Sequence, residues 1–300
     1  MSAMSLELTR AEQGNPRAKA PDPARPPVEI VRPVREVSPV IFASPHSGRT
    51  YTDDFLAQSA MSLSNLRRSE DAYVDELMAA APQAGATLVL AQFPRVFVDP
   101  NRSEDEIDPV LTGGRPDPLA TIRSPRANAG LGIIPRLGAD GMSIHRDVLK
   151  PDEVTRRIAQ FHAPYHAALE KEVARILARF GHAIVIDMHS MPSISAPGLD
   201  AVIGDRHGIS CAPAISDTVE SALQREGLRT RRNVPYAGAF TTERYGRPAL
   251  HRHAIQIEIN RGLYLDEERV TRSGTFDALK TRLTGFIDTI VKTDWSLKLS

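Results

Sequence analysis

The sequence predicts an α/β fold, a single domain in which a mixed, mostly parallel sheet is sandwiched between helices. Two short, continuously apolar runs, residues 39–44 and 183–188, have the composition of strands that are buried on both faces of a sheet. A long segment with helical periodicity, residues 151–180, precedes the second run. Each apolar run leads within two residues into a histidine, as expected where the carboxyl ends of strands in an open α/β sheet present chemistry.

Composition and charge narrow the class of protein. The 37 basic and 37 acidic residues cancel, so no positive field is expected to attract nucleic acid or a membrane surface. Cys211 is the only cysteine, which excludes an internal disulfide bond and a cysteine-based zinc site and fits a reducing compartment. The N-terminus lacks the apolar segment of a signal peptide, and no run approaches the roughly 18 apolar residues of a membrane span. We therefore expect a cytoplasmic protein that acts on a small molecule.

The N-terminal 36 residues differ in composition from the rest. They are rich in proline, arginine, alanine and glutamate, and four prolines lie within residues 21–27. Such a segment cannot form a regular helix and has little apolar surface to bury. We expect residues 1–36 to be a mobile arm, with partner binding as the alternative, and residues 37–300 to form the α/β domain.

The first half of the domain shows short elements followed by a long connection. Within residues 70–81, the apolar residues Tyr73, Val74, Leu77 and Met78 form a stripe at helical spacing, which predicts a helix. Apolar runs predict strands at 86–90 and 96–98. Residues 103–145 contain glycine, proline and arginine throughout and little periodicity. A connection of that length inside a compact domain is usually a functional loop.

The second half is more regular. Residues 151–180 predict a long helix, because proline and two acids suit its first turn, apolar residues recur at three- and four-residue steps, and Gly181 ends it. Pro164 lies inside this helix and should kink it. Further strands are expected at 183–188, 201–204 and 254–259, and a final helix carries apolar residues from Phe276 to Ile290.

Two histidines and an acid are candidates for a metal site. His46 and His189 each follow a buried strand, which favours one site built from distant parts of the chain, although either could be an ordinary hydrogen-bonded loop residue. A hydrolytic zinc site uses three protein ligands and an open position for water. Asp71 is the preferred third ligand and Glu70 the alternative acid. Both could instead complement the dipole of the helix that they begin.

A candidate general base lies on the strand at 254–259. Apolar residues there alternate with Gln256, Glu258 and Asn260, so these three share the opposite face of the strand. A carboxylate inside a sheet is costly unless it is paired or used. We expect Glu258 to take a proton from water, with a salt bridge to an arginine as the alternative role.

Candidate substrate-binding residues follow the predicted strand at 96–98. Asn101 and Arg102 offer an amide and a planar guanidinium fork, which together suit a substrate carboxylate. An arginine in a loop is otherwise usually a surface residue. We also expect Ser47, beside the first histidine, and Arg247 to contribute to substrate binding.

Several longer motifs occur in order between residues 39 and 268. They are Ser-Pro-His-Ser-Gly-Arg-x-Tyr (44–51), Glu-Asp-x-Tyr-Val-Asp-Glu-Leu (70–77), Phe-Val-Asp-Pro-Asn-Arg (97–102), Pro-Tyr-His (164–166), Ile-Asp-Met-His-Ser-x-Pro (186–192), Ile-Gly-Asp-Arg-x-Gly (203–208), Asn-x-Pro-Tyr-Ala-Gly (233–238), Tyr-Gly-Arg-Pro (245–248) and Gln-Ile-Glu-Ile-Asn-Arg-x-Leu-Tyr (256–264). In this set and order the chain resembles the N-formylglutamate amidohydrolases, also called N-formylglutamate deformylases.

The resemblance implies a fold related to the zinc-dependent exopeptidases, which are phosphorylase/hydrolase-like, and to the aspartoacylase and succinylglutamate desuccinylase group. Carried over by position, the implied roles are zinc ligation by His46, Asp71 and His189, water activation by Glu258, and carboxylate binding by Asn101 and Arg102. Position 49 is Arg rather than the Glu of the exopeptidase His-x-x-Glu motif, so the acidic ligand must come from elsewhere. Ala-Gly-Ala-Phe at 237–240 replaces an expected Gly-Gly step, which bears on the choice of acyl group.

These observations together predict a metal-dependent amidohydrolase with one zinc ion, or another divalent metal, per chain. The expected substrate is a small N-acyl amino acid, best N-formyl-L-glutamate, which would be cleaved to formate and L-glutamate. Further arginines are expected to help Arg102 hold a dicarboxylate: Arg115, Arg123, Arg126, Arg244 or Arg247. The alternatives are a related zinc deacylase or peptidase with another N-acyl substrate, and a non-catalytic binding protein on the same scaffold. A binder would need no such combination of two histidines, an acid and Glu258.

Overall fold

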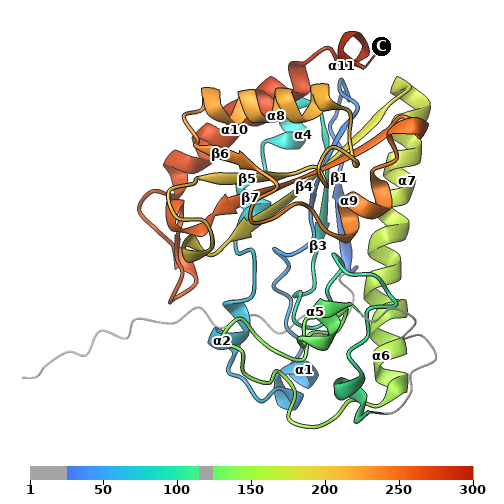
Figure 1. Cartoon of the computed structure of the whole chain (residues 1–300), viewed down its shortest axis with the longest axis vertical. Coiled ribbons are helices and arrows are strands. Elements are labelled where there is room, and N and C mark those ends of the chain that lie inside the picture. Colours follow the sequence, from blue (N-terminus) through green and yellow to red (C-terminus); the bar gives the residue numbers. More distant parts are fainter. Residues whose placement is uncertain (1–25, 115–123, 300) are drawn as a thin grey trace, which may run out of the picture.

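A twisted central sheet organises the computed structural model, which describes residues 26–114 and 124–299 (Figure 1). Its strands are Val28–Val31 (β1), Val40–Ser44 (β2), Thr87–Ala91 (β3), Ala183–Met191 (β4), Ala201–Gly204 (β5), Thr230–Arg232 (β6) and Arg252–Asn260 (β7). Their order across the sheet is β1-β3-β2-β4-β7-β5-β6. β3, β2, β4 and β7 pair in parallel and so do β5 and β6, whereas β1 pairs antiparallel with β3 and β5 antiparallel with β7. A separate two-stranded sheet joins Leu265–Asp266 (β8) to Thr271–Arg272 (β9).

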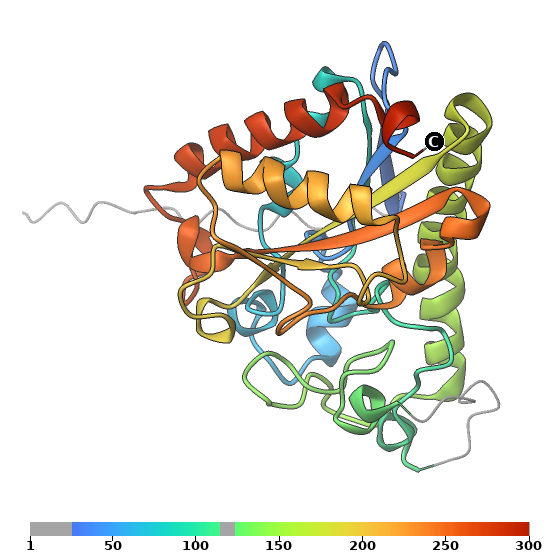
Figure 2. The same ribbon diagram turned by 45° about the horizontal axis from the view of Figure 1, so that its top comes forward.

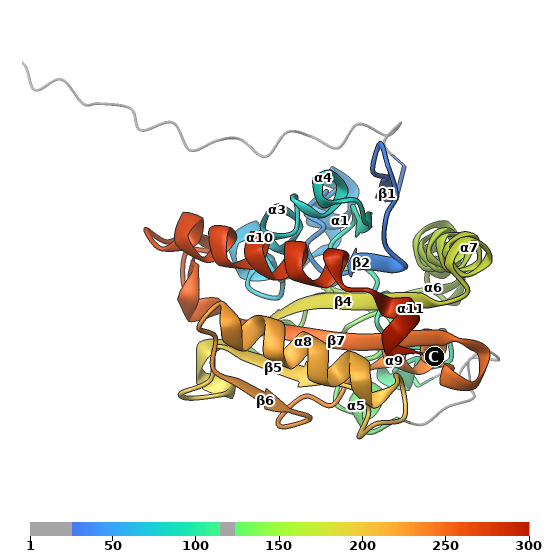
Figure 3. The ribbon, with the colours of Figure 1, turned by 90° about the horizontal axis from the view of Figure 1, so that it is seen from above.

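Helices cover both faces of the sheet. On one face lie Val74–Leu77 (α3), Ala81–Ala84 (α4), Pro213–Arg225 (α8) and Phe276–Lys292 (α10). Ala163–Phe180 (α7) packs on the other face, and in Figure 1 and Figure 2 it lies away from α8 and α10. Figure 3 shows α7 nearly end-on while α8 and α10 run across the view. The remaining helices are Asp53–Gln58 (α1), Leu63–Arg67 (α2), Pro125–Asn128 (α5), Pro151–Arg157 (α6), Phe240–Tyr245 (α9) and Trp295–Lys298 (α11).

The two faces of β4 show how the sequence builds two cores. Ile184, Ile186 and Met188 belong to the apolar cluster beneath α8 and α10. Val185 points to the opposite face and joins the cluster beneath α7. Because side chains alternate along a strand, Asp187 follows Val185 on this second face. The predicted α/β class, with one domain and a mostly parallel sheet between helices, is confirmed.

The C-terminal part of the predicted arm belongs to the fold. Residues 28–31 form β1, whose register sets Val28 opposite Ala91 and Val31 opposite Leu88. Glu36 is buried and pairs with Arg175 of α7. The prediction of a mobile arm over residues 1–36 is therefore wrong for residues 26–36, because an edge strand tolerates the neighbouring prolines. Residues 1–25 lie outside the described part of the chain.

The predicted helix over residues 70–81 is divided into α3 and α4. The backbone N–H of Asp71 donates to the carbonyl of His46 (3.0 Å), and Tyr73 adopts a left-handed conformation (φ 64°) before α3. A continuous helix over residues 70–81 would need right-handed helical dihedral angles at Tyr73, so the left-handed backbone at this residue delays the start of α3 until Val74. The apolar stripe was identified correctly, because Val74, Leu77 and Met78 are fully buried.

Two other predicted elements differ in detail. Residues 96–98 are buried but form a turn rather than a strand, since Phe97 N–H donates to Pro94 O. The long helix at 151–180 consists of α6, a π-helical turn at Ile158–His162 and α7. This wider turn precedes Pro164, whose ring would clash with the carbonyl of an ordinary α turn. Helices α8 and α9 and strand β6 were not predicted.

Within the described ranges, no helix combines the length and apolar character needed to cross a membrane.

The loop after β2 packs closely against the backbone of residues 91–93 at Gly48. A Cβ at this position would lie 2.3 Å from the carbonyl oxygen of Phe93 and 2.7 Å from that of Ala91. These are backbone atoms and cannot move aside cheaply, so we expect Gly48→Ala to lower the free energy of unfolding by about 1–3 kcal/mol. The measurement is the midpoint of urea denaturation.

Gly274→Ala is the matched control for this substitution. No atom lies within 4 Å of a Cβ at Gly274, and its backbone is not left-handed. We expect this variant to unfold at the wild-type urea concentration or slightly above it. Equal midpoints for the two variants would show that the loop after β2 has room that the structure does not indicate.

Candidate active site

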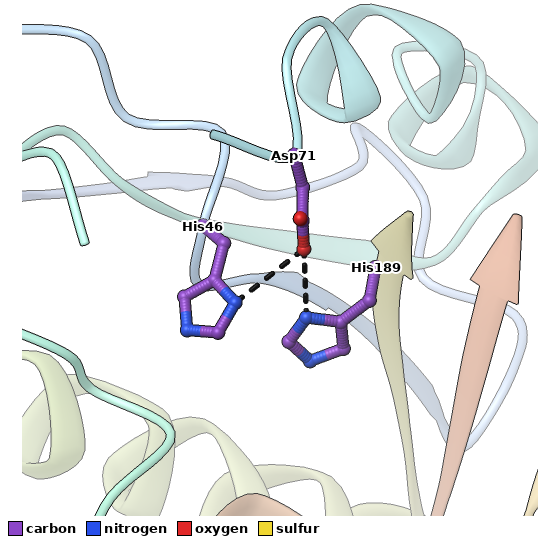
Figure 4. A group of neighbouring side chains, drawn as sticks. All are labelled: His46, Asp71 and His189. Carbon is purple, nitrogen blue, oxygen red and sulfur yellow. Dashed lines mark hydrogen bonds and ion pairs between the residues drawn. The ribbon is translucent and has the colours of Figure 1, made fainter. Parts of the chain in front are cut away.

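Two histidines and an aspartate meet at the carboxyl ends of the parallel strands. His46 follows β2, His189 lies near the end of β4, and Asp71 follows α2. Asp71 Oδ2 lies 2.9 Å from His189 Nδ1 and 3.4 Å from His46 Nδ1, and the side chains converge from three segments (Figure 4). All three residues are buried, and one potential ligand atom from each lies within 4.8 Å of the others. The structure thus brings together the three residues that the sequence singled out.

A carboxylate is hydrogen-bonded to each imidazole at the ring nitrogen that faces away from Asp71. His46 Nε2 lies 2.6 Å from Asp99 Oδ1, and His189 Nε2 lies 2.8 Å from Asp187 Oδ2. When each Nε2 carries a proton and donates it to its carboxylate, the neutral imidazoles direct their Nδ1 lone pairs toward the space beside Asp71, where a cation can bind. Among the described residues, the buried Nδ1 of His46 has no hydrogen-bond partner. Two nitrogen ligands and one carboxylate oxygen, with carboxylates behind the imidazoles, fit a zinc ion or another divalent cation.

The electrostatics of this cluster favour positive charge between the three side chains. Burial acts to raise the pKa of Asp71, but the hydrogen bond with His189 and the nearby imidazole of His46 outweigh it and hold that pKa well below its usual value. Burial acts to lower the pKa of His189, but the carboxylates of Asp187 and Asp71 raise it well above its usual value. Arg261 Nη2 also donates to Asp71 Oδ1 (2.9 Å). The cluster is therefore suited to a cation, whether a proton or a metal ion.

Glu258 lies beside this cluster on β7. The sheet register sets it opposite His189, and both side chains line the same pocket, whose volume is about 350 Å³. Gln256 Nε2 donates to Glu258 Oε1 (2.8 Å). Burial raises the pKa of Glu258, the charge of Asp71 raises it further, and His189 opposes both. A raised pKa brings a carboxylate toward the range in which it can exchange protons at neutral pH.

The predicted carboxylate-binding pair also lines the pocket. Arg102 is only 9% exposed, and it donates from Nε to Leu131 O (3.1 Å) and from Nη1 to Asn101 O (2.9 Å). The side-chain oxygen of Asn101 accepts from the N–H (2.8 Å) and the hydroxyl (3.0 Å) of Thr241. Its Nδ2 lies 3.1 Å from His189 Nε2. Much of the Asn101 amide is therefore engaged within the protein.

Two predicted substrate-binding residues lie elsewhere. The buried Ser47 hydroxyl is 2.8 Å from that of Ser44, and Ser47 is not among the residues that line the pocket. Arg247 is exposed, and its Nη1 donates to the backbone carbonyls of Glu243 and Gly246. Neither residue lines the pocket, because the loop after β2 turns Ser47 inward and α9 ends before Arg247 at the surface.

Glu70, the alternative acid, faces away from the histidines. It accepts a hydrogen bond from the Tyr51 hydroxyl (2.8 Å) and pairs with Arg67. Burial raises the pKa of Glu70, while Arg67 opposes this effect. Its neighbour Asp71, one residue along, is the acid in the cluster. Of the further arginines considered, Arg126 lines the pocket, Arg244 is exposed, and Arg115 and Arg123 fall outside the described residues.

Sequence reasoning did not assign the four residues that support the cluster. Asp99 and Asp187 each stand two residues before a site residue that was predicted, Asn101 and His189. For Asp187 the two-residue period of a strand is the signal, because it sets both side chains on one face. Arg95 and Arg261 pair with Asp99 and Asp71 through tertiary contacts, for which the sequence carries no comparable signal.

A second group of buried residues holds the loop at 99–102. His162 Nε2 lies 2.9 Å from the carbonyl oxygen of Arg102, and His166 Nε2 lies 2.8 Å from that of Pro100. The other ring nitrogen of His166 contacts the Tyr245 hydroxyl (2.9 Å). Burial lowers the pKa of both His162 and His166, so each stays neutral and donates to its carbonyl.

Comparison with known proteins agrees with this geometry. The family model for N-formylglutamate amidohydrolase matches residues 38–265, and this segment contains all of the cluster and its supporting residues. The chain belongs to the N-formylglutamate amidohydrolase family. Two curated relatives of this family member are N-formylglutamate deformylases. The one from Pseudomonas aeruginosa is 30% identical over 242 residues, which are 77% of this chain and 83% of the relative. The one from Pseudomonas putida is 29% identical over 241 residues, 76% of this chain and 82% of the relative.

Solved structures also resemble this N-formylglutamate amidohydrolase family member. The N-formylglutamate amidohydrolase from Ralstonia eutropha JMP134 superposes with a TM-score of 0.84 at 37% identity, covering 89% of this chain and 97% of that one. The gene product Atu2144 from Agrobacterium tumefaciens has a TM-score of 0.62 at 18% identity and covers 88% of this chain and 94% of that one. The second likeness shows the fold alone. The first agrees with the family that the sequence motifs predicted.

Proposed function

We propose that this protein hydrolyses the amide bond of N-formyl-L-glutamate to formate and L-glutamate in a reaction that requires one divalent metal ion, best zinc. The observation that carries the proposal is the convergence of His46 Nδ1, His189 Nδ1 and Asp71 Oδ2, with a carboxylate behind each imidazole. Membership of the N-formylglutamate amidohydrolase family supports the choice of substrate. The single buried cysteine supports a reducing, cytoplasmic location.

The proposed metal ligands are His46, Asp71 and His189. A zinc ion held by these residues would supply Lewis-acid chemistry, which would lower the pKa of water toward about 7 and polarise the acyl oxygen. Asp99 and Asp187 hold the Nε2 protons and so keep each Nδ1 free for the metal. Arg261 fixes the Asp71 carboxylate by occupying its other oxygen.

Glu258 is the proposed general base and acid. It lines the pocket next to His189 and is held by Gln256 through one oxygen only. We assign it the proton of the attacking water, which it then passes to the nitrogen of the leaving amine. The raised pKa that burial gives this carboxyl suits both directions of transfer.

Arg102 is the proposed partner of a substrate carboxylate. Its Nε and Nη1 are fixed by backbone carbonyls, which holds the guanidinium plane in place at the pocket wall. An orientation fixed before binding reduces the entropy lost when substrate is held.

The direct test of the whole proposal is a metal analysis of the purified protein, followed by assays of a panel of N-acyl amino acids for released amine. Release from N-formylglutamate should be the fastest of the panel.

The first prediction concerns the metal ligands. His189→Ala removes one of three donor atoms, and we expect the purified protein to lose most of its zinc and its hydrolytic activity while its circular dichroism stays that of a folded protein. Zinc content is measured by mass spectrometry. Asp71→Ala should lose more zinc than Glu70→Ala, because only Asp71 reaches the histidines. A His189→Ala protein that keeps one equivalent of zinc contradicts the assignment.

The second prediction concerns the base. Glu258→Gln keeps the size and the contact with Gln256 but cannot accept a proton. We expect kcat to fall by about 10²- to 10⁴-fold with zinc still bound, since general acid–base catalysis usually contributes that much. Rates and zinc content are measured on the same preparation. Loss of zinc in this variant would instead make Glu258 part of the metal site.

The third prediction concerns Arg102. Lysine is a point donor and cannot reproduce a two-pronged contact, so Arg102→Lys should lose about 1.5–3 kcal/mol of transition-state binding. This corresponds to a fall of roughly 10- to 150-fold in kcat/KM for N-formyl-L-glutamate. The control is the analogue in which the matching carboxylate is an amide, where the loss should be small. An equal loss on every analogue would make Arg102 structural.

A further inference from the structure

Among the described residues, three arginines of the pocket lack a carboxylate partner. Five arginines line the pocket, and two of them are paired, Arg95 with Asp99 and Arg261 with Asp71. Within the described ranges, Arg68, Arg102 and Arg126 form no ion pair, so no carboxylate of that part of the chain lies within ion-pair distance of their guanidinium groups. A pocket with spare guanidinium groups next to a site for amide hydrolysis is suited to a substrate that carries more than one negative charge.

Arg102 and Arg126 belong to one wall of the pocket. A single residue, Leu131, joins them through its backbone, because its N–H donates to Arg126 O (2.8 Å) and its carbonyl accepts from Arg102 Nε (3.1 Å). Burial is the main cause that lowers the pKa of Arg102, and the positive charge of Arg126 lowers it further, against the opposing charge of Asp99. The two guanidinium groups therefore repel one another across a short stretch of pocket wall, and bound anions would relieve that repulsion.

The two arginines differ in depth. Arg102 is 9% exposed and follows Asn101, whose side chain contacts His189 of the cluster. Arg126 is exposed and belongs to the short helix α5 at the outer part of the wall. In an N-acyl glutamate, the α-carboxylate is attached to the carbon that bears the scissile nitrogen, whereas the side-chain carboxylate is two methylene groups farther away. The carboxylate nearer the reacting amide must therefore lie nearer the cluster.

We propose that Arg102 binds the α-carboxylate of the substrate and that Arg126 binds its side-chain carboxylate, so that the pair selects N-acyl amino acids with an acidic side chain. This assignment rests on the proposed amide hydrolysis at the same site. Arg68 is the competing candidate, but it lies on a different segment of the lining. The hydroxyl of the adjacent residue, Ser69, accepts a hydrogen bond from the backbone N–H of Ala139. Among the described residues, no hydrogen bond or ion pair connects Arg68 to Arg102.

Three substrates distinguish the contribution of the α-carboxylate from that of the side-chain carboxylate. They are N-formyl-L-glutamate, its side-chain amide N-formyl-L-glutamine, and its α-amide N-formyl-L-isoglutamine. Arg126→Gln should lower kcat/KM by roughly 10- to 150-fold for N-formylglutamate and for the α-amide, and only slightly for N-formylglutamine, which has no side-chain charge to lose. Arg102→Gln should show the complementary pattern, with the small effect on the α-amide.

Two further variants serve as comparisons. Arg68→Gln should change kcat/KM by less than about fivefold on all three substrates. Arg231→Gln removes an exposed arginine of β6 that does not line the pocket, and it should match the wild-type enzyme. An equal loss for Arg126→Gln on all three substrates, or a selective loss in Arg68→Gln instead, overturns the assignment of Arg126.

Binding measured without turnover distinguishes this inference from the proposed reaction. Calorimetric titration of the purified protein should show L-glutamate binding more tightly than L-glutamine, with the difference abolished in Arg126→Gln. An enzyme that hydrolyses no N-formyl amino acid but shows this pattern contradicts the proposed reaction and supports the carboxylate assignment. Equal binding of L-glutamate and L-glutamine to the wild-type protein overturns the assignment, whatever the outcome of the activity assays.

Discussion

The buried Asp71 carboxylate is the group on which the site depends, because among the described residues it alone contacts both imidazoles and an arginine. Charges alternate outward from it, through His46 to Asp99 and Arg95, and through His189 to Asp187. Buried charges are tolerated only where each has a partner, and removal of one partner typically costs about 3–5 kcal/mol. The same alternation that makes the cluster stable therefore holds the two imidazoles and the Asp71 carboxylate in fixed positions around one point.

The parallel sheet makes this network possible. Neighbouring strands β2, β4 and β7 end at the same edge, so residues separated by more than a hundred positions become neighbours there. Register then decides which groups meet, with Asp187 beside Gln256 and His189 beside Glu258. Asp71, the third residue of the cluster, comes from no strand, and the chain interrupts its helical periodicity after α2 so that this side chain can reach the histidines.

The proposed metal site and the proposed carboxylate-binding site share one loop. Asp99 supports His46, Asn101 contacts His189, and Arg102 faces the pocket, all within four residues. Two neutral histidines, His162 of the π-helical turn and His166 of α7, donate hydrogen bonds to backbone carbonyls of this loop. π-helical turns occur often at functional sites, and here the wider turn brings His162 under the loop. A change in this support should affect ligand geometry and carboxylate binding together.

The sequence by itself determined the α/β class, most strands and the helical segments that contain α7 and α10, because apolar periodicity is a local signal. It also singled out five residues that meet at the pocket or beside it: His46, Asp71, His189, Glu258 and Arg102. It did not determine that residues 28–31 join the sheet as an edge strand, that residues 70–81 are broken, or that Ser47 and Arg247 point away from the pocket. Those outcomes depend on contacts between segments far apart in the chain. Only the tertiary structure showed which of the described pocket arginines are paired with carboxylates and which are not, since ion pairing is a property of three-dimensional distance and not of spacing along the sequence.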